Sequence, residues 1–157
     1  MTRRYGRAPK GERVFGSVPL GHWEVTTLIG ALAIDGLRAS FSVDAATDGD
    51  VFQTFVHQVL RPALHPGDVV IWDNLPAHKV PALKPLLESV PATLLPLPPY
   101  SPDFNPIEEC WSKVKECLRA TEARTREALE QAITRALASV TATDARGWFQ
   151  HCGYRLT

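Results

Sequence analysis

The chain has 157 residues, of which 45% are apolar and 22% are charged, and its formal net charge is zero. This length and composition are typical of one soluble globular domain with a real core. Its three cysteines never stand in a C-x-x-C spacing and its longest apolar stretch, near residues 27–34, is too short to cross a bilayer, so we expect no disulfide framework, zinc site, membrane span or export.

The zero net charge conceals an uneven distribution along the chain. Residues 1–13 carry five basic side chains against Glu12, whereas residues 14–107 hold nine acidic residues against four basic ones. A basic head of this kind suits a phosphate backbone, although a solvated, frayed terminus has the same composition. We treat residues 1–14 as a basic amino-terminal segment of a single domain.

The first regular elements predicted along the chain form a β-hairpin. Residues 25–34 and 37–43 are rich in β-formers, and Asp35-Gly36 between them is a strong signal for a tight turn. A helix follows from Thr47 or Asp48, either of which suits a cap, to Pro62. Its apolar side chains recur at helical spacing, which predicts an amphipathic helix lying on the sheet.

An alternating β-α-β unit comes next. Residues 68–72 follow Pro66-Gly67 and are continuously apolar from Val69, as in a buried strand of parallel type, so Asp73 stands at a strand's carboxyl end. A short helix over residues 80–90 and a strand over 92–97 complete the unit. The sequence therefore predicts an α/β class with a mixed sheet.

The next predicted helix determines which glutamate faces a site. Asn105 is a good N-cap and Pro106 suits the first helical position. On such a helix Glu108 flanks the apolar stripe, whereas Glu109 points roughly opposite to it, toward solvent and four residues before Lys113. Two further helices, capped near Thr125 and beginning at Thr143, are predicted to form a carboxyl-terminal helical layer.

Each candidate residue also has a purely structural interpretation. Asp73-Asn74 suits a turn after a strand, and Glu108 suits the first turn of a helix without any catalytic duty. His78 after that turn is more often a structural hydrogen-bonder than a ligand. The same holds for the final His-Cys-Gly-Tyr, interpreted as a helix stop with local packing, and for Lys113 and Lys115, interpreted as a solvated face.

Taken together, these segments carry a family resemblance. The runs WDNLPAHK at 72–79, LPPYSPDFNPIEECWSKVK at 97–115 and HCGY at 151–154 resemble the catalytic domain of mariner-type transposases of bacterial insertion sequences, in the DDE superfamily. RYGRAPKGERV at 4–14 and IGALAIDG at 29–36 extend the resemblance over nearly the whole chain. It implies a ribonuclease H-like fold whose acidic triad binds two divalent metals, and it matches Asp73 to the second acid and Glu108 to the third.

The implied chemistry is metal-dependent cutting and rejoining of DNA strands. Two metals, Mg²⁺ or Mn²⁺, about 3.5–4 Å apart would activate the attacking oxygen and stabilise the leaving one, and carboxylates are the ligands that such hard cations demand. Asp73 and Glu108 are the predicted catalytic and metal-binding residues. Asn74, His78, Asn105 and Lys115 are the candidates to support those ligands or to contact DNA.

The chain also departs from the family pattern. The first acid of the triad belongs on a strand upstream of residues 4–14, in a pattern resembling DE-x-x-F, and this sequence does not contain it. We do not expect Asp35, Asp44, Asp48 or Asp50 to replace it. The predicted domain is therefore a partial one, with the ribonuclease H-like part at 15–120 lacking its first, central strand and carboxyl-terminal helices at 121–157.

Three functional hypotheses follow. The first is the carboxyl-terminal portion of a transposase, either the downstream product of a frameshifted gene or a decayed copy, with little activity as an isolated chain. The second is a non-catalytic DNA-binding or interaction protein that regulates full-length transposase; the third, and weakest, is a ribonuclease or repair nuclease. The first implies DNA as partner, a homodimer or fusion with an upstream reading-frame product, no membrane, and a bacterial cytoplasmic, nucleoid-associated location.

Overall fold

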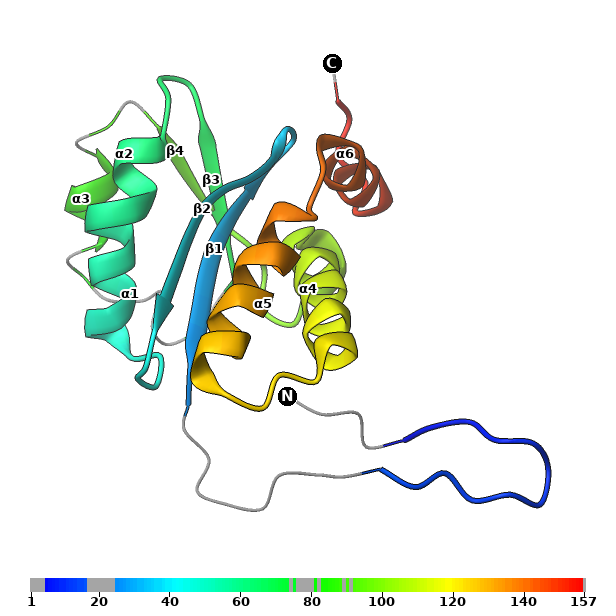
Figure 1. Cartoon of the computed structure of the whole chain (residues 1–157). Helices are drawn as coiled ribbons and strands as arrows, with labels where there is room; N and C mark the ends of the chain where they lie inside the picture. The colour runs from blue at the N-terminus through cyan, green and yellow to red at the C-terminus, as the bar shows by residue number, and fades with distance from the viewer. Residues whose placement is uncertain are drawn as a thin grey trace.

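In the computed structural model, two pairs of strands lie between helices (Figure 1). The structure describes residues 5–16, 25–73, 75, 81, 83–88, 90 and 92–156. The elements in chain order are β1 (Thr27–Ala33), β2 (Gly36–Val43), α1 (Gly49–Phe55), a π-helical turn (Val56–Leu60), α2 (Arg61–Ala63), β3 (Val69–Trp72), α3 (Leu83–Glu88), β4 (Thr93–Pro96), a 3-10 turn (Pro102–Phe104), α4 (Ile107–Thr121), α5 (Arg126–Ala138) and α6 (Ala142–His151).

The predicted hairpin is confirmed. β1 and β2 pair antiparallel, from Thr27 opposite Val43 to Ala33 opposite Gly36, whose positive φ of 127° is accessible to glycine at little cost. Alternate side chains of β1 enter different cores: Ile29 and Ala31 pack toward α1, whereas Leu28 and Leu32 pack toward α4 and α5. The hairpin is therefore covered by helices on both faces, which explains the nearly continuous apolar sequence of β1.

The predicted helix after Asp48 is also confirmed. The Asp48 carboxylate accepts a hydrogen bond from the Val51 N–H (2.9 Å) and caps α1. The helical path continues through the π-helical turn into α2 and ends at Ala63, one residue beyond the predicted proline. Its buried side chains form the core beneath the strands: Phe52, Phe55, Val56 and Leu60.

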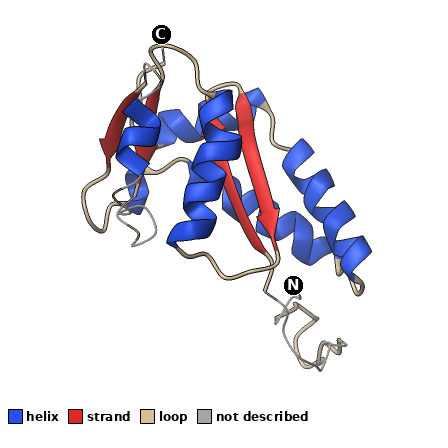
Figure 2. Cartoon of the chain, turned by 90° about the vertical axis from the view of Figure 1, so that its left-hand side faces the viewer, coloured by secondary structure: helices blue, strands red, loops and turns tan. Residues whose placement is uncertain are grey.

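The strands after Gly67 form a second sheet rather than part of one continuous mixed sheet. β3 and β4 pair in parallel, from Val69 opposite Thr93 to Trp72 opposite Pro96, with α3 in the connection. Figure 2 shows the long and the short strand pair separately. The α/β class is confirmed, but within the described residues no strand pairs with β1 or β3 on the side where the two sheets face each other.

The predicted carboxyl-terminal helical layer is confirmed. Thr125 caps α5 by accepting from the Ala128 N–H (3.1 Å), and Thr141 caps α6 in a reciprocal capping box with Asp144. The start of α6 is therefore Ala142, one residue before the predicted Thr143. The core of this layer consists of Cys110, Val114, Leu118, Ala132, Ile133 and Ala136.

No helix within the described ranges is long and apolar enough to cross a bilayer. All three cysteines are free thiols. Cys110 is fully buried in the helical core, and this burial raises the pKa of its thiol to about 11. The thiol therefore stays protonated at neutral pH.

Candidate active site

A cavity of about 530 Å³ separates the two sheets. One wall is β1, from Leu28 to Ala33, with Ile34 after it, and the opposite wall is the segment from Asp68 to Asp73. Phe52, Phe55 and Leu60 close one face, and α4 closes the other through Ile107 and Trp111. The walls are mostly apolar, so the few polar groups that reach the cavity define where chemistry can take place.

Asp73 enters the cavity because it directly follows β3 and lies at the carboxyl end of that strand. Its Oδ1 atom accepts a hydrogen bond from the Leu75 N–H (3.2 Å), which fixes the side chain in a local turn. The structural interpretation of Asp73 as a turn residue is thus correct, and it is compatible with a position on the cavity wall.

Glu108 reaches the cavity from the first turn of α4. Its N–H donates to the Asn105 carbonyl (3.1 Å), and its charge complements the positive end of the helix dipole. Glu108 and Glu109 are both exposed, but Glu109 does not line the cavity. The predicted distinction between the two glutamates agrees with this arrangement.

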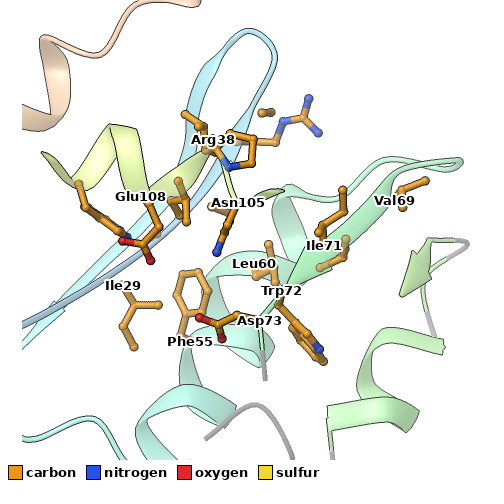
Figure 3. Close-up of a pocket in the computed structure, with 18 of the residues that line it drawn as sticks. Ile29, Arg38, Phe55, Leu60, Val69, Ile71, Trp72, Asp73, Asn105 and Glu108 are labelled. Atoms are coloured by element: carbon orange, nitrogen blue, oxygen red, sulfur yellow. The ribbon is translucent and has the colours of Figure 1, made fainter. Parts of the chain in front are cut away.

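The predicted N-cap of α4 is wrong by one residue. Pro106 takes the cap position, and Asn105 instead ends the preceding 3-10 turn, where its N–H donates to the Pro102 carbonyl (2.8 Å). Because Asn105 belongs to this turn, it does not cap α4. The Asn105 side chain instead lines the cavity together with Asp73 and Glu108. Figure 3 shows all three side chains turned toward the same space.

Of the remaining predicted site residues, Lys115 lies within the described residues, and it does not join this group. Lys115 is exposed on α4 and lies outside the cavity lining. Asn74 and His78 lie outside the described residues. Of the acids considered as replacements, Asp48 caps α1 and Asp44 pairs with Arg126, and neither they nor Asp35 and Asp50 line the cavity.

A further carboxylate in the lining lies at the opposite end of the cavity. Asp68 precedes β3 and accepts a hydrogen bond from Arg38 (2.8 Å). Four residues lie between Asp68 and Asp73, so the two are five residue steps, or about 16 Å, apart at the rise of a strand. Asp68 is therefore part of a structural ion pair between the two sheets rather than of the Asp73 and Glu108 group.

Lys113 corrects the prediction of a solvated face. Its Nζ donates to the Asp144 carboxylate (2.6 Å) and to the Ser139 carbonyl (2.8 Å), so it joins α4 to the start of α6. The Lys113 ammonium and the Thr141 hydroxyl hold the pKa of the Asp144 carboxyl down to about 2. These hydrogen bonds therefore join α4, the helix that carries Glu108, to the start of α6.

Sequence reasoning also missed the contribution of Tyr154. Its hydroxyl donates to the Phe104 carbonyl (2.8 Å), and its ring packs edge-on against Phe149 (centroids 5.5 Å apart). This contact holds the 3-10 turn that leads into Asn105 and Glu108. The available signal was the resemblance of the HCGY segment itself, which was interpreted only as local packing.

The polar side chains that line the cavity are of the kinds that bind a hard divalent cation. Two carboxylates and an amide side chain line one cavity, and Mg²⁺ commonly takes one or two protein carboxylates and completes its shell with water and substrate. Within the described residues there is no cluster of three or more His, Cys, Asp or Glu side chains that would hold a metal ion. Asp73 and Glu108 are thus two ligands of a suitable kind, not a complete protein cage.

The comparison with known families agrees with this geometry. Residues 1–130 match the model of the DDE superfamily endonuclease family. The chain belongs to this family. None of the curated proteins matches the chain.

Solved structures show which fold this family member shares. The strand transfer complex of Mos1 matches all of the chain with a TM-score of 0.72 at 16% identity, and the Mos1 mariner paired end complex with Mn matches 97% with a TM-score of 0.71 at 17% identity. The catalytic domain of Mos1 mariner transposase matches 81% with a TM-score of 0.60 at 16% identity. The chain spans 51% and 47% of the length of the first two chains and 67% of the third. The expected ribonuclease H-like α/β fold is confirmed.

Proposed function

We propose that this DDE family member is the carboxyl-terminal portion of a mariner-type DNA transposase of an insertion sequence, acting by metal-dependent phosphoryl transfer. The observation that carries the proposal is the position of Asp73 and Glu108. They come from the end of β3 and from the first turn of α4, and they line the same cavity. The structural neighbours support it, since their names describe transposase complexes.

In this proposal Asp73 and Glu108 hold the metals, Mg²⁺ or Mn²⁺, at the cavity end, and Asn105 lines the cavity beside them as a supporting residue. Bound divalent cations would polarise the scissile phosphate and lower the pKa of an attacking water. The chain's own residues orient the ligands: the Leu75 N–H fixes Asp73, and the carbonyl of Asn105 anchors the Glu108 backbone. The Mos1 complex with Mn supports this choice of metal.

DNA is the proposed partner, and the basic segment at the amino terminus supports it. Residues 5–16 extend away from the body of the molecule (Figure 1) and are exposed throughout. Arg7, Lys10 and Arg13 place three positive charges on this arm, against Glu12. Such a solvated basic segment can follow a phosphate backbone without reading bases. We propose a homodimer, or a fusion with an upstream reading-frame product, as the working form in a bacterial cytoplasm, associated with the nucleoid.

We infer that cleavage requires a third carboxylate, because the described residues bring only Asp73 and Glu108 to this end of the cavity. The isolated chain should therefore show little nuclease activity, whereas a fusion with an upstream segment that supplies an aspartate should cleave DNA with Mg²⁺ or Mn²⁺. In that fusion, Asp73→Ala and Glu108→Ala should each lower the cleavage rate by more than about 100-fold. A loss of about 100-fold is the upper end of what removal of a residue that only supports a metal ligand causes.

Glu109→Ala is the matched control, since Glu109 lies one residue from Glu108 and points to solvent. It should retain nearly full cleavage in the same gel-based assay of labelled DNA. Strong magnesium-dependent cleavage by the isolated chain that Asp73→Ala abolishes would contradict the need for a third acid. Equal loss with Glu109→Ala would contradict the assignment of Glu108.

A second candidate is a non-catalytic regulator that joins full-length transposase and inhibits it. The observation in its favour is that the described residues bring only Asp73 and Glu108 to this end of the cavity, whereas two-metal chemistry commonly uses more ligands. Co-expression with an intact related element should then depress transposition, and Glu108→Ala should leave the inhibition unchanged. Inhibition that disappears with Glu108→Ala would favour the catalytic portion instead.

A further inference from the structure

Gly30 lies in the middle of β1, where a glycine weakens a strand because it has no side chain to pack. Leu28 and Leu32 on either side of it pack toward α4 and α5, and by the alternation of a strand Gly30 belongs to the same face. The backbone does not require glycine here, since Gly30 is not among the residues with positive φ. The missing side chain leaves a space between the two leucines, which we call the notch.

The indole ring of Trp111 occupies the notch. A Cβ at Gly30 would lie 2.9 Å from Cη2 and 3.2 Å from Cζ2 of that ring, and 3.2 Å from the carbonyl oxygen of Ala39 on β2. A planar ring in close-packed surroundings has no freedom to bend away from such an atom. The contact therefore fixes how closely α4 approaches β1.

Trp111 and Glu108 lie one turn apart on α4. Side chains at i and i+3 are neighbours on a helix, and long side chains lean back over the preceding turn. Both residues line the cavity, together with Ile107. Because a helical turn is held by its own backbone hydrogen bonds, it moves as a unit. A displacement of Trp111 therefore also displaces Glu108.

The other contacts of α4 fix the helix from different directions. Its buried side chains pack against α5, and Lys113 joins it to the start of α6. Those contacts hold α4 within the helical layer, whereas Trp111 in the notch holds it against β1. β1 is the cavity wall opposite the segment that ends at Asp73. The approach of α4 to β1 thus bears directly on the separation between Glu108 and Asp73.

We propose that Trp111, seated in the notch at Gly30, is a positioning residue that sets the place of Glu108 relative to Asp73. The inference rests on the proposed function, in which these two carboxylates hold divalent metals. Metal ligands must be held to within about 0.5 Å of their productive geometry. In Gly30→Ala the ring must withdraw by about 0.5 Å to restore ordinary contact with the new Cβ, so one methyl group is enough to displace Glu108.

Crystal structures of the full chain and of Gly30→Ala test the geometry without any metal. When the two are superposed on β1 and β2, the Trp111 ring and Glu108 should lie about 0.5 Å farther from β1 in the variant. Gly147→Ala on α6 is the matched control, since a Cβ there meets nothing within 4 Å, and it should displace neither residue. A Glu108 that keeps its place while the ring moves would overturn the proposal.

Titration of the same chains with Mn²⁺, followed by electron paramagnetic resonance, measures the consequence for metal binding. Gly30→Ala should weaken Mn²⁺ binding by about tenfold, as loss of a residue that orients a metal ligand does, whereas Gly147→Ala should leave it unchanged. Ile133→Ala is the control for stability alone: it weakens the helical core, lies outside the cavity lining and should not change the Mn²⁺ affinity. An equal loss with Ile133→Ala would show that only stability is at stake and would overturn the proposal.

Trp111→Phe provides a second variant that does not crowd the notch. It removes the part of the indole that a Cβ at Gly30 would meet, so α4 loses its seat on β1 and Mn²⁺ binding should weaken several-fold. Combined with Gly30→Ala, it should bind Mn²⁺ no worse than Trp111→Phe alone, because the new methyl group then fills the space. Losses that simply add would contradict the contact between Gly30 and Trp111 as the positioning device.

The two measurements separate this inference from the proposed function. Displacement of Glu108 in a chain whose Mn²⁺ binding is unaffected by Asp73→Ala would support the positioning role and overturn the proposed metal site. Mn²⁺ binding that Asp73→Ala abolishes and Gly30→Ala leaves unchanged would overturn the positioning role and support the proposed function.

Discussion

The two halves of the molecule differ in how completely the backbone N–H and C=O groups of each half find hydrogen-bond partners within that half. In the helical half, α4, α5 and α6, Thr125 caps α5 and a capping box closes the start of α6. The Lys113–Asp144 ion pair joins α4 to α6. In the cavity half, β3 and β4 with α1 to α3, a two-stranded sheet borders a cavity of about 530 Å³. A helix forms its backbone hydrogen bonds internally, whereas a strand needs neighbouring strands to form them.

The largest expected effect comes from the core of the cavity half. Phe55 is 2% exposed and packs against the rings of Phe41 and Phe52 (centroids 6.5 and 6.0 Å). Phe55→Ala should lower the free energy of unfolding by about 3–5 kcal/mol, because it removes a large buried ring and enlarges a void. Urea denaturation with hydrogen exchange should show β3 and β4 losing protection before α4 to α6.

Ile133→Ala in the helical core is the counterpart variant, with an expected loss of about 2–5 kcal/mol. It should weaken the protection of α4 and α5 themselves. If both variants lowered protection uniformly across the chain, the two halves would be one cooperative unit and the contrast between them would be wrong.

A smaller effect is expected where α6 joins α4. Lys113→Met removes hydrogen bonds to Asp144 and Ser139 and should lower stability by about 1 kcal/mol, because the pair is only partly shielded from water. The pKa of Asp144 is depressed to about 2, so its contribution is present above the unfolded value of about 3.9 and is lost as pH falls between about 4 and 2.

Thermal unfolding at several pH values checks this. The difference in Tm between the parent and Lys113→Met should shrink below pH 4. Arg126→Ala, which removes an exposed ion pair with Asp44, is the control and should change Tm little at any pH. A Lys113→Met difference that stayed constant down to pH 2 would show that the charge of Asp144 is not what stabilises this junction.

The smallest effects compare one helix cap in each half. Asp48→Ala and Thr125→Ala should each cost about 1 kcal/mol, since each removes a side-chain acceptor for a first-turn N–H. Thr134→Ala is the control: its hydroxyl bonds to the Glu130 carbonyl within α5 and caps nothing, so its effect should be near zero. Chemical denaturation measures all three. A cap in one half that cost nothing would show that its helix end is already frayed.

Much of the fold was predictable because its signals are local. The Asp35-Gly36 turn, the caps at Asp48 and Thr125 and the apolar periodicity of α1, α4 and α5 each depend on residues within one or two turns of chain. The start of α4 was predicted one residue early because the 3-10 turn at Pro102–Phe104 competes for Asn105. Local capping preference does not reveal such competition.

The candidate site was predictable only through the resemblance. Asp73 and Glu108 each have an adequate structural role, and neither residue by itself indicates a site. The sequence distinguished Glu108 from Glu109 because helical periodicity is a local property. It made Asn105 a candidate supporting residue only through the resemblance, and it did not reveal that Tyr154 holds the turn before it, since that depends on a contact between distant segments.

The class of the fold, the order of its elements and the identity of the two acids could be inferred from the sequence. Hydrophobic periodicity, turn residues and motifs are local properties of the chain and can be recognised without the tertiary structure. Tertiary packing alone places Asp73 and Glu108 on one cavity, joins α4 to α6 through Lys113, and sets β1 and β3 on opposite walls of that cavity. The physical reason is that lateral pairing of strands and packing of side chains join residues far apart in sequence, and no local pattern specifies which edges meet.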